Sequence, residues 1–258
     1  MCMIDISNLS LALNGSAILN NISLTMNDGE IVGLIGKSGS GKTMLLKSIA
    51  GRIRSYGGTV TVRDPAARET ERGRRKSVSY YGSAMPQNPE ESLYNFLILA
   101  RVAYKKPFRP FSDYDRQVTE EYLSALDLGR YSGARIGTLP DGIFRLAMLA
   151  HTLIGERHAV VFDNPTNDLD ILSVRLFRNA LARYVMNGSR VAVVSSNDLN
   201  FISQTADRIV ILADGRIVET GTADIMTADT IRRHFGIDVL ISRNIYNGKP
   251  EIHLFPDA

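Results

Sequence analysis

The sequence is poor in cysteine, in tryptophan and in long hydrophobic runs. Among its 258 residues Cys2 is the only cysteine, and tryptophan is absent. A single cysteine excludes an intramolecular disulfide, which fits a reducing compartment. No stretch approaches the ~18 consecutive apolar residues of a membrane-spanning helix. The N-terminal residues lack the basic start and continuous apolar middle of a signal peptide. We therefore expect a soluble, cytosolic chain that reaches a membrane only through a partner.

The composition also lacks a strong excess of one charge. The chain has 30 Lys and Arg residues against 27 Asp and Glu residues, for a formal net charge of +3. This balance permits an anionic ligand or a nearby membrane surface but requires neither. The basic run Arg68–Lys76 contains interleaved acidic residues and no aromatic residue, which is typical of a solvated loop. We expect no nucleic-acid partner.

The order of apolar segments predicts an α/β fold. Three short strands are expected in residues 4–35, separated by turns at Asn14-Gly15 and Asp28-Gly29. We expect an N-terminal antiparallel β portion in this part of the chain. After residue 155, strand and helix patterns alternate, which favours a mainly parallel sheet flanked by helices. The pattern between residues 88 and 150 is helical, and we interpret it as a helical subdomain inserted into the sheet.

The strongest motif is the glycine-rich segment GKSGSGKT. It follows the strand-like IVGLI and opens a helix, which is the setting of a phosphate-binding P-loop. Glycines let backbone N–H groups converge on phosphate oxygens, and the helix N-terminus adds its positive end. Lys42 is expected to reach the β- and γ-phosphates, and the Thr43 hydroxyl to bind Mg²⁺. Lys37 could add charge near the ligand or point to solvent. The predicted nucleotide site comprises Gly36, Lys37, Ser38, Gly39, Ser40, Gly41, Lys42 and Thr43.

A second polar segment, FDNPTNDLD, begins at Phe162. Four apolar residues, Ala159 to Phe162, run into Asp163. A carboxylate at the end of a buried strand can hold Mg²⁺ through water. In isolation, an aspartate that caps the strand would be an equal alternative, but behind a phosphate loop the magnesium interpretation is favoured.

The order of these motifs resembles that of ABC-type ATPase domains. Gln87 after Pro86, a helical insertion, TLPDGI before a helix, FDNPTNDLD and VVSSND follow one another as in that family, across essentially the whole chain. The resemblance implies one domain over residues 1–258, with the helical subdomain at 88–150 and a C-terminal extension at 224–258.

Two segments point to a subgroup of the family. Residues 111–139 and 227–256 resemble the ATPase subunits of importers for iron-siderophores, haem and vitamin B12. Within the second segment, Asn247-Gly248 is typical of a two-residue hairpin turn.

The resemblance implies a role for each matching residue. Residues 36–43 cradle the phosphates of ATP. Gln87 senses Mg²⁺ and the attacking water, and relays to a transmembrane partner. Asp163 holds Mg²⁺ through water. Asp170 lies in the loop that faces a second ATPase subunit, and Leu139 to Ile143 fill the signature segment that contacts nucleotide across that dimer.

Two positions depart from the catalytic residues of the family. Asn164 stands where the family has a glutamate that polarises the attacking water, and Asn197 stands where it has a histidine. An amide can hydrogen-bond to water but is not a useful base, and general-base catalysis is typically worth ~10²–10⁴-fold. Asn197 cannot titrate. We therefore expect Mg-ATP binding with weakened hydrolysis.

The signature segment and the adenine-stacking position depart as well. Pro140 has neither hydroxyl nor N–H where the family has serine. Asp141 is expected to cap the following helix, and it places a negative charge at the end meant for phosphate. A well-capped helix start is favoured here over nucleotide contact. Leu13 stands where the family stacks an aromatic ring on adenine, a contact worth ~1–3 kcal/mol.

The resemblance implies the ATP-binding subunit of an ABC importer, peripheral on the inner face of the cell membrane. Its implied partners are transmembrane permease subunits, a substrate-binding protein and a second ATPase subunit, identical or different. Residues 96–99, FLIL, could dock a membrane subunit or pack inside the helical subdomain. A nucleotide-binding regulatory or scaffold protein is the alternative. An ATPase acting on DNA or ribosomes and a small-molecule kinase fit the motifs less well.

Overall fold

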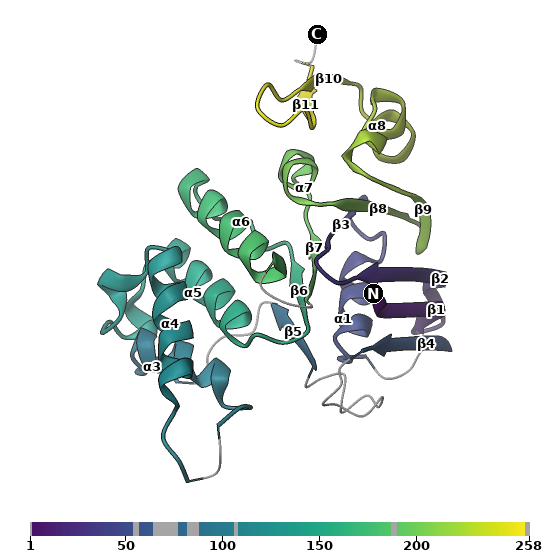
Figure 1. Ribbon diagram of the computed structural model, residues 1–258. Helices are drawn as coiled ribbons and strands as arrows, with labels where there is room; N and C mark the ends of the chain where they lie inside the picture. Colours follow the sequence, from purple (N-terminus) through teal and green to yellow (C-terminus); the bar gives the residue numbers. More distant parts are fainter. Residues whose placement is uncertain are drawn as a thin grey trace.

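The computed structural model describes residues 2–53, 57–63, 77–81, 88–105, 108–186 and 190–255. Its centre is a six-stranded sheet in the order β5-β6-β7-β3-β8-β9 (Figure 1). Five strands are parallel and β9 runs antiparallel to β8. The strands are β3 (Ile31–Ile35), β5 (Val78–Tyr81), β6 (Ala159–Asp163), β7 (Val191–Ser195), β8 (Arg208–Ala213) and β9 (Arg216–Gly221).

Alternate residues of the central strands face two separate cores. Val161 and Val193 pack toward α1 (Lys42–Ile49) and the N-terminal strands. Phe162 and Val194 face the other core, which contains side chains of the helices. Both faces of the parallel sheet are therefore covered, which explains why its strands read as continuous apolar runs.

The N-terminal strands form their own antiparallel sheet. Its order is β2-β1-β4, with β1 (Cys2–Leu13), β2 (Ser16–Asn27) and β4 (Gly57–Val62). Buried and exposed residues alternate along most of β2, so one face packs onto the core and the other meets solvent. Helix α1 lies between this sheet and the central sheet (Figure 1). The α/β class with an antiparallel N-terminal portion is confirmed.

A group of helices lies between β5 and β6 in the chain. It packs beside α6 (Ile171–Met186), on the side of the central sheet away from the N-terminal strands (Figure 1). Its members are α3 (Leu93–Ile98), η1 (Leu99–Arg101), α4 (Asp113–Ala125), η2 (Gly129–Tyr131), η3 (Ile136–Thr138) and α5 (Asp141–Ile154). The domain limits at residues 88, 150 and 224 stay predictions.

The C-terminal segment folds back on α7 (Leu199–Thr205). It contains η4 (Ala223–Ile225), α8 (Ala228–Phe235), β10 (Val239–Arg243) and β11 (Pro250–Leu254). The Asn200 amide fixes β11 at two points: its Oδ1 accepts from the Ile252 N–H at 2.7 Å and its Nδ2 donates to the Ile252 carbonyl at 2.9 Å.

The predicted two-residue turn at Asn247-Gly248 is wrong. The last strand pair joins Arg243 to Pro250, so residues 244–249 form the connection. The Asn244 side chain explains the longer loop, because its Oδ1 accepts from the backbone N–H groups of Tyr246 and Asn247. Such side-chain bonds replace those of a tight turn.

Candidate functional site

The glycine-rich loop between β3 and α1 has a backbone conformation that residues with a side chain could not adopt. Gly36, Gly39 and Gly41 have φ values of 153°, 81° and 103°. A Cβ on Gly36 would lie 2.1 Å from the Leu212 carbonyl oxygen, and one on Gly41 would lie 2.8 Å from a Leu19 methyl. Glycine is thus required for conformation at all three positions and for space at Gly36 and Gly41, as expected of a loop that presents backbone N–H groups to a phosphate.

Lys42 is folded over this loop. Its Nζ donates to the carbonyl oxygens of Gly36 at 2.6 Å and Lys37 at 2.9 Å. Burial lowers the pKa of Lys42, while the charge of Asp163 acts in the opposite direction. The ammonium group is therefore held by neutral carbonyls in a poorly hydrated place, where an anionic ligand would gain most from it.

A cavity of about 310 Å³ opens at the loop. Residues 38–44 line it together with Ile18, Asn164 and Asn197. Within the described part of the chain, the Oγ of Ser40 and the Oδ1 of Asn164 are buried without a hydrogen-bond partner. Buried polar atoms are normally satisfied, so these two atoms favour a polar ligand in this cavity. Lys37 points elsewhere: its Nζ lies 3.5 Å from where a Cβ on Gly236, beyond α8, would be.

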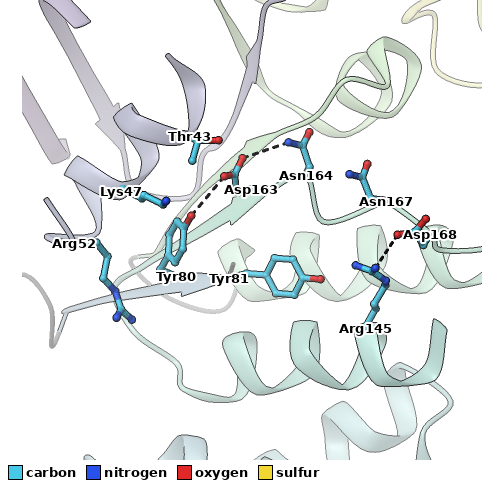
Figure 2. A pocket seen from close by; sticks show the side chains of 10 residues that line it. All are labelled: Thr43, Lys47, Arg52, Tyr80, Tyr81, Arg145, Asp163, Asn164, Asn167 and Asp168. Atoms are coloured by element: carbon cyan, nitrogen blue, oxygen red, sulfur yellow. Dashed lines mark hydrogen bonds and ion pairs between the residues drawn. The ribbon is translucent and has the colours of Figure 1, made fainter. Parts of the chain in front are cut away.

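A larger cavity of about 790 Å³ adjoins the ends of β5 and β6 (Figure 2). Asp163 and Asp168 are the carboxylates in its lining, and Lys47, Arg52 and Arg145 are its basic residues. The remaining lining residues are Thr43, Tyr80, Tyr81, Asn164 and Asn167. The cavity is thus strongly polar and shares Thr43 and Asn164 with the loop cavity.

Among the described residues, three donors contact the Asp163 carboxylate. Ser195 Oγ donates to Oδ1 at 2.8 Å, and the Asn164 amide reaches the same oxygen at 3.4 Å. The Tyr80 hydroxyl lies 3.5 Å from Oδ2. Burial, together with the charge of Asp163, raises the pKa of Tyr80 to about 12, so the phenol stays protonated and donates.

Oxygen atoms near the loop suit a hard divalent cation. Thr43 and Asp163 line the same cavity, and Oδ2 of Asp163, which accepts from Tyr80 at 3.5 Å, keeps a second lone pair for a ligand. Mg²⁺ is usually held by one or two carboxylates together with phosphate oxygens and water. These residues therefore fit Mg²⁺ bound with a nucleotide.

The comparison with known families decides the assignment. The ABC transporter family profile matches residues 19–167, which is more than half of the chain. The chain belongs to the ABC transporter family. The predicted family is confirmed.

Individual ABC proteins resemble the chain along its whole length. The cobalamin import ATP-binding protein of Halobacterium salinarum is 24% identical over 98% of the chain, which spans 64% of the length of that relative. A hemin import ATP-binding protein of Gloeobacter violaceus is 27% identical over 96% of the chain and 92% of its own length.

Solved structures show the same fold. An ABC transporter described as metal-chelate type, in an inward-facing conformation, superposes with a TM-score of 0.80 at 18% identity, covering 100% of the chain and 98% of its own. Within the described ranges of our structure, no helix is long and apolar enough to cross a membrane.

The structure brings most of the predicted site residues of this ABC protein together. Thr43, Asp163 and Asn164 line one cavity, and Asn164 and Asn197 line the loop cavity. Gln87 lies outside the described residues, as does the basic run 68–76.

The signature segment differs from the prediction at its helix start. The N-cap of α5 is Pro140, and no side chain in the described part of the chain caps this helix start. The predicted capping role of Asp141 is therefore wrong, because this residue already lies in the first turn. Its negative charge still lies at the helix N-terminus, as predicted.

The Asp170 side chain lies at the start of α6, where it accepts a hydrogen bond from the Ser173 N–H at 2.7 Å.

Sequence reasoning missed three residues of the site. Tyr80 and Ser195 contact Asp163 from neighbouring strands, and Arg145 pairs with Asp168. The position of Ser195, at the end of an apolar strand beside the one that ends in Asp163, was an available signal. Tyr80 and Arg145 gave none, because either would read as an ordinary strand or helix residue.

Proposed function

We propose that this ABC protein is the ATP-binding subunit of an importer for a metal chelate of the iron-siderophore, haem or cobalamin class. The observation that carries the proposal is the preformed phosphate cradle, with Lys42 held above it and Asp163 beside Thr43. The cargo class is supported by the names of the cobalamin and hemin relatives.

ATP and Mg²⁺ are the proposed ligands. Bound Mg²⁺ would neutralise charge on the β- and γ-phosphates. Residues 36–43 would hold the phosphates through backbone N–H groups, Lys42 would donate to them, and Thr43 and Asp163 would hold the metal. Gln87 keeps its proposed metal role. Ile18 and the half-exposed Leu13 offer adenine an aliphatic contact, so we expect weak binding of the base.

Hydrolysis is proposed to be weak. Asn164 and Asn197 line the cavity where a base and a titratable group would act, and neither amide can accept a proton usefully. Asp168 is the other carboxylate near Asn164, but its Oδ2 lies 2.8 Å from Arg145 Nη2. That ion pair ties the carboxylate to Arg145 of α5, so Asp168 is a poor replacement.

The subunit is proposed to dock on permease subunits at the inner face of the cell membrane, and to pair with a second ATPase subunit. A substrate-binding protein would complete the system. Phe96, Leu97 and Ile98 pack inward, with Phe96 stacked on His151 at 4.5 Å. Leu99 is 46% exposed and remains available to a partner.

The second candidate is a nucleotide-binding regulatory subunit that performs no transport. The two asparagines in the cavity favour it, since they retain hydrogen bonding to a bound ligand while removing the base. ATP-dependent uptake of cargo distinguishes the two candidate functions, because only an importer subunit supports it.

The test measures ATP binding and steady-state turnover with Mg²⁺ on the purified chain and on its Lys42→Ala variant. We expect binding by the wild type, loss of at least 10-fold in affinity in the variant, and little turnover in either. Failure of the wild type to bind ATP would contradict the proposal. Rapid turnover that depends on Lys42 would retain the ATP-binding role and overturn the weak hydrolysis.

Cargo uptake is measured in proteoliposomes that contain the subunit with its permease and binding protein. The importer predicts uptake of a metal chelate that requires both ATP and Lys42. ATP binding without any such uptake would favour the regulatory subunit.

A further inference from the structure

Ser195 makes contacts that its place in the fold does not require. It ends β7 and is fully buried, after the four apolar residues Val191 to Val194. Its hydroxyl donates to Asp163 Oδ1 at 2.8 Å. The same Oγ accepts from the backbone N–H of Asn164 at 3.1 Å. One hydroxyl thus bridges the two consecutive residues at the end of β6.

The bridge is held in register by the sheet. Asp163 is paired with Ser195 across the parallel strands β6 and β7. Neighbouring parallel strands end at the same edge, so Ser195 lies beside Asp163 at the edge where Asp163 lines the larger cavity. The Ser195 side chain is packed in the core and has little rotational freedom, which fixes the direction of its O–H bond toward the carboxylate.

The hydrogen bond from the Asn164 N–H does not explain why a serine stands at position 195. That N–H also donates to the Ser195 backbone carbonyl at 3.1 Å, which any residue at this position would supply. The contact that depends on the hydroxyl is the one with Asp163. The two other donors to this carboxylate, Tyr80 and Asn164, lie at 3.5 and 3.4 Å and are weaker.

We propose that Ser195 is a positioning residue that orients the Asp163 carboxylate for Mg²⁺ bound with nucleotide. By donating to Oδ1, the hydroxyl fixes the rotation of the carboxylate and leaves Oδ2, whose contact with Tyr80 is long, to serve the metal. Partners of this kind typically change metal affinity or activity 10–100-fold when removed. The inference rests on the proposed function, because it assumes that nucleotide and Mg²⁺ bind here.

The test compares wild type with Ser195→Ala and Ser195→Thr. ATP binding is titrated calorimetrically at a series of Mg²⁺ concentrations and in EDTA, and thermal unfolding is recorded for each variant. Ser203→Ala is the matched control. Ser203 is likewise fully buried, its hydroxyl donates to the Pro250 carbonyl at 2.6 Å, and it lies in α7 outside the linings of both cavities.

We expect Ser195→Ala to raise, by about 10-fold or more, the Mg²⁺ concentration that gives half of the maximal Mg²⁺-dependent change in ATP affinity. The affinity for ATP in EDTA should be unchanged. Ser195→Thr keeps the hydroxyl and should restore the Mg²⁺ response, even if its extra methyl lowers the unfolding temperature. Ser203→Ala should change only the unfolding temperature.

A merely structural role predicts a different outcome. Ser195→Ala would then lower the unfolding temperature and leave the Mg²⁺ midpoint within about 2-fold of wild type, which would overturn the inference while the proposed function stands. Wild-type ATP binding that does not respond to Mg²⁺ would overturn the inference as well. Absence of ATP binding in the wild type would instead overturn the proposed function, and the inference with it.

Discussion

Arg145 Nη2 lies 2.8 Å from Asp168 Oδ2, which ties helix α5 to the loop that follows Asn164 (Figure 2). Both side chains are exposed, at 40% and 67%. Exposed ion pairs contribute about 0–1 kcal/mol to stability. The importance of this pair is therefore local: it restrains a short loop at the rim of the site and adds little to the stability of the fold.

Breaking this ion pair should loosen the loop selectively. In Arg145→Ala we expect faster amide hydrogen exchange in residues 164–170, because one restraint on the loop is gone, and a loss of less than about 1 kcal/mol in unfolding free energy. Arg135→Ala is the control, since it breaks a more exposed ion pair, with Glu90, outside this loop. Unchanged exchange in residues 164–170 would show that the loop is held by its backbone alone.

Restoring a carboxylate at position 164 should raise ATP turnover. Asn164→Glu is expected to increase the steady-state rate ~10²-fold, the lower range of general-base catalysis. Asn164 has a φ of 47°, which asparagine tolerates better than glutamate, so we also expect a loss of ~1 kcal/mol in stability.

The control for this substitution is Asn164→Gln. It imposes the same backbone cost and similar side-chain volume without a carboxylate, so turnover should remain at the wild-type level. Equal gains in both variants would mean that side-chain size, and not the base, changed the rate.

The buried ion network around Arg101 should dominate the stability of the helical group. Arg101 is 3% exposed, its Nε donates to Asp115 at 2.9 Å and its Nη1 donates to Glu156 at 2.8 Å. Arg101→Ala leaves the buried Asp115 without its arginine partner, while Glu156 keeps its ion pair with Arg190, and removal of one partner of a buried ion pair costs about 3–5 kcal/mol.

Chemical denaturation of Arg101→Ala and of Arg135→Ala measures the difference. The second variant removes a pair that is 66% and 70% exposed, so less than about 1 kcal/mol should be lost. Similar losses in the two variants would mean that burial does not decide the strength of these pairs.

His151 should make the fold less stable in mild acid. Burial lowers its pKa from 6.5 to about 4, so the folded state keeps the ring neutral while the unfolded chain takes up a proton. Between pH 6.5 and 4 the unfolded state binds more protons, and stability present above pH 6.5 is lost as the pH falls. The loss approaches ~3 kcal/mol near pH 4.

The variant His151→Phe isolates this effect. It keeps an aromatic ring against Phe96 but cannot titrate, so its unfolding free energy should fall less steeply across the same pH window. Denaturant titrations at several pH values provide the measurement. A slope equal to that of the wild type would assign the acid sensitivity to other groups.

Local patterns were enough to predict much of the architecture. The turns at Asn14-Gly15 and Asp28-Gly29 separate β1, β2 and β3 as expected. The apolar run 159–162 forms a buried strand that ends in Asp163. These features depend on neighbours in the chain, through side-chain alternation and glycine conformation, so periodicity and turn chemistry reveal them.

Predictions that depended on competing local bonds were less successful. The hairpin turn at Asn247-Gly248 gave way to a longer loop because Asn244 bonds to two backbone N–H groups within it. The cap expected from Asp141 is absent because Pro140 takes the N-cap position. In both places a neighbouring residue, Asn244 or Pro140, decided the local geometry.

The sequence by itself determined the glycine-rich loop, the strand that ends in Asp163 and the two asparagines at 164 and 197. Only the tertiary structure decided which side chains surround Asp163. Ser195 lies 32 residues from it in the chain and Tyr80 lies 83 residues away, yet both contact its carboxylate. The physical reason is the parallel sheet, which places the ends of β5, β6 and β7 along one edge whatever the length of chain between them.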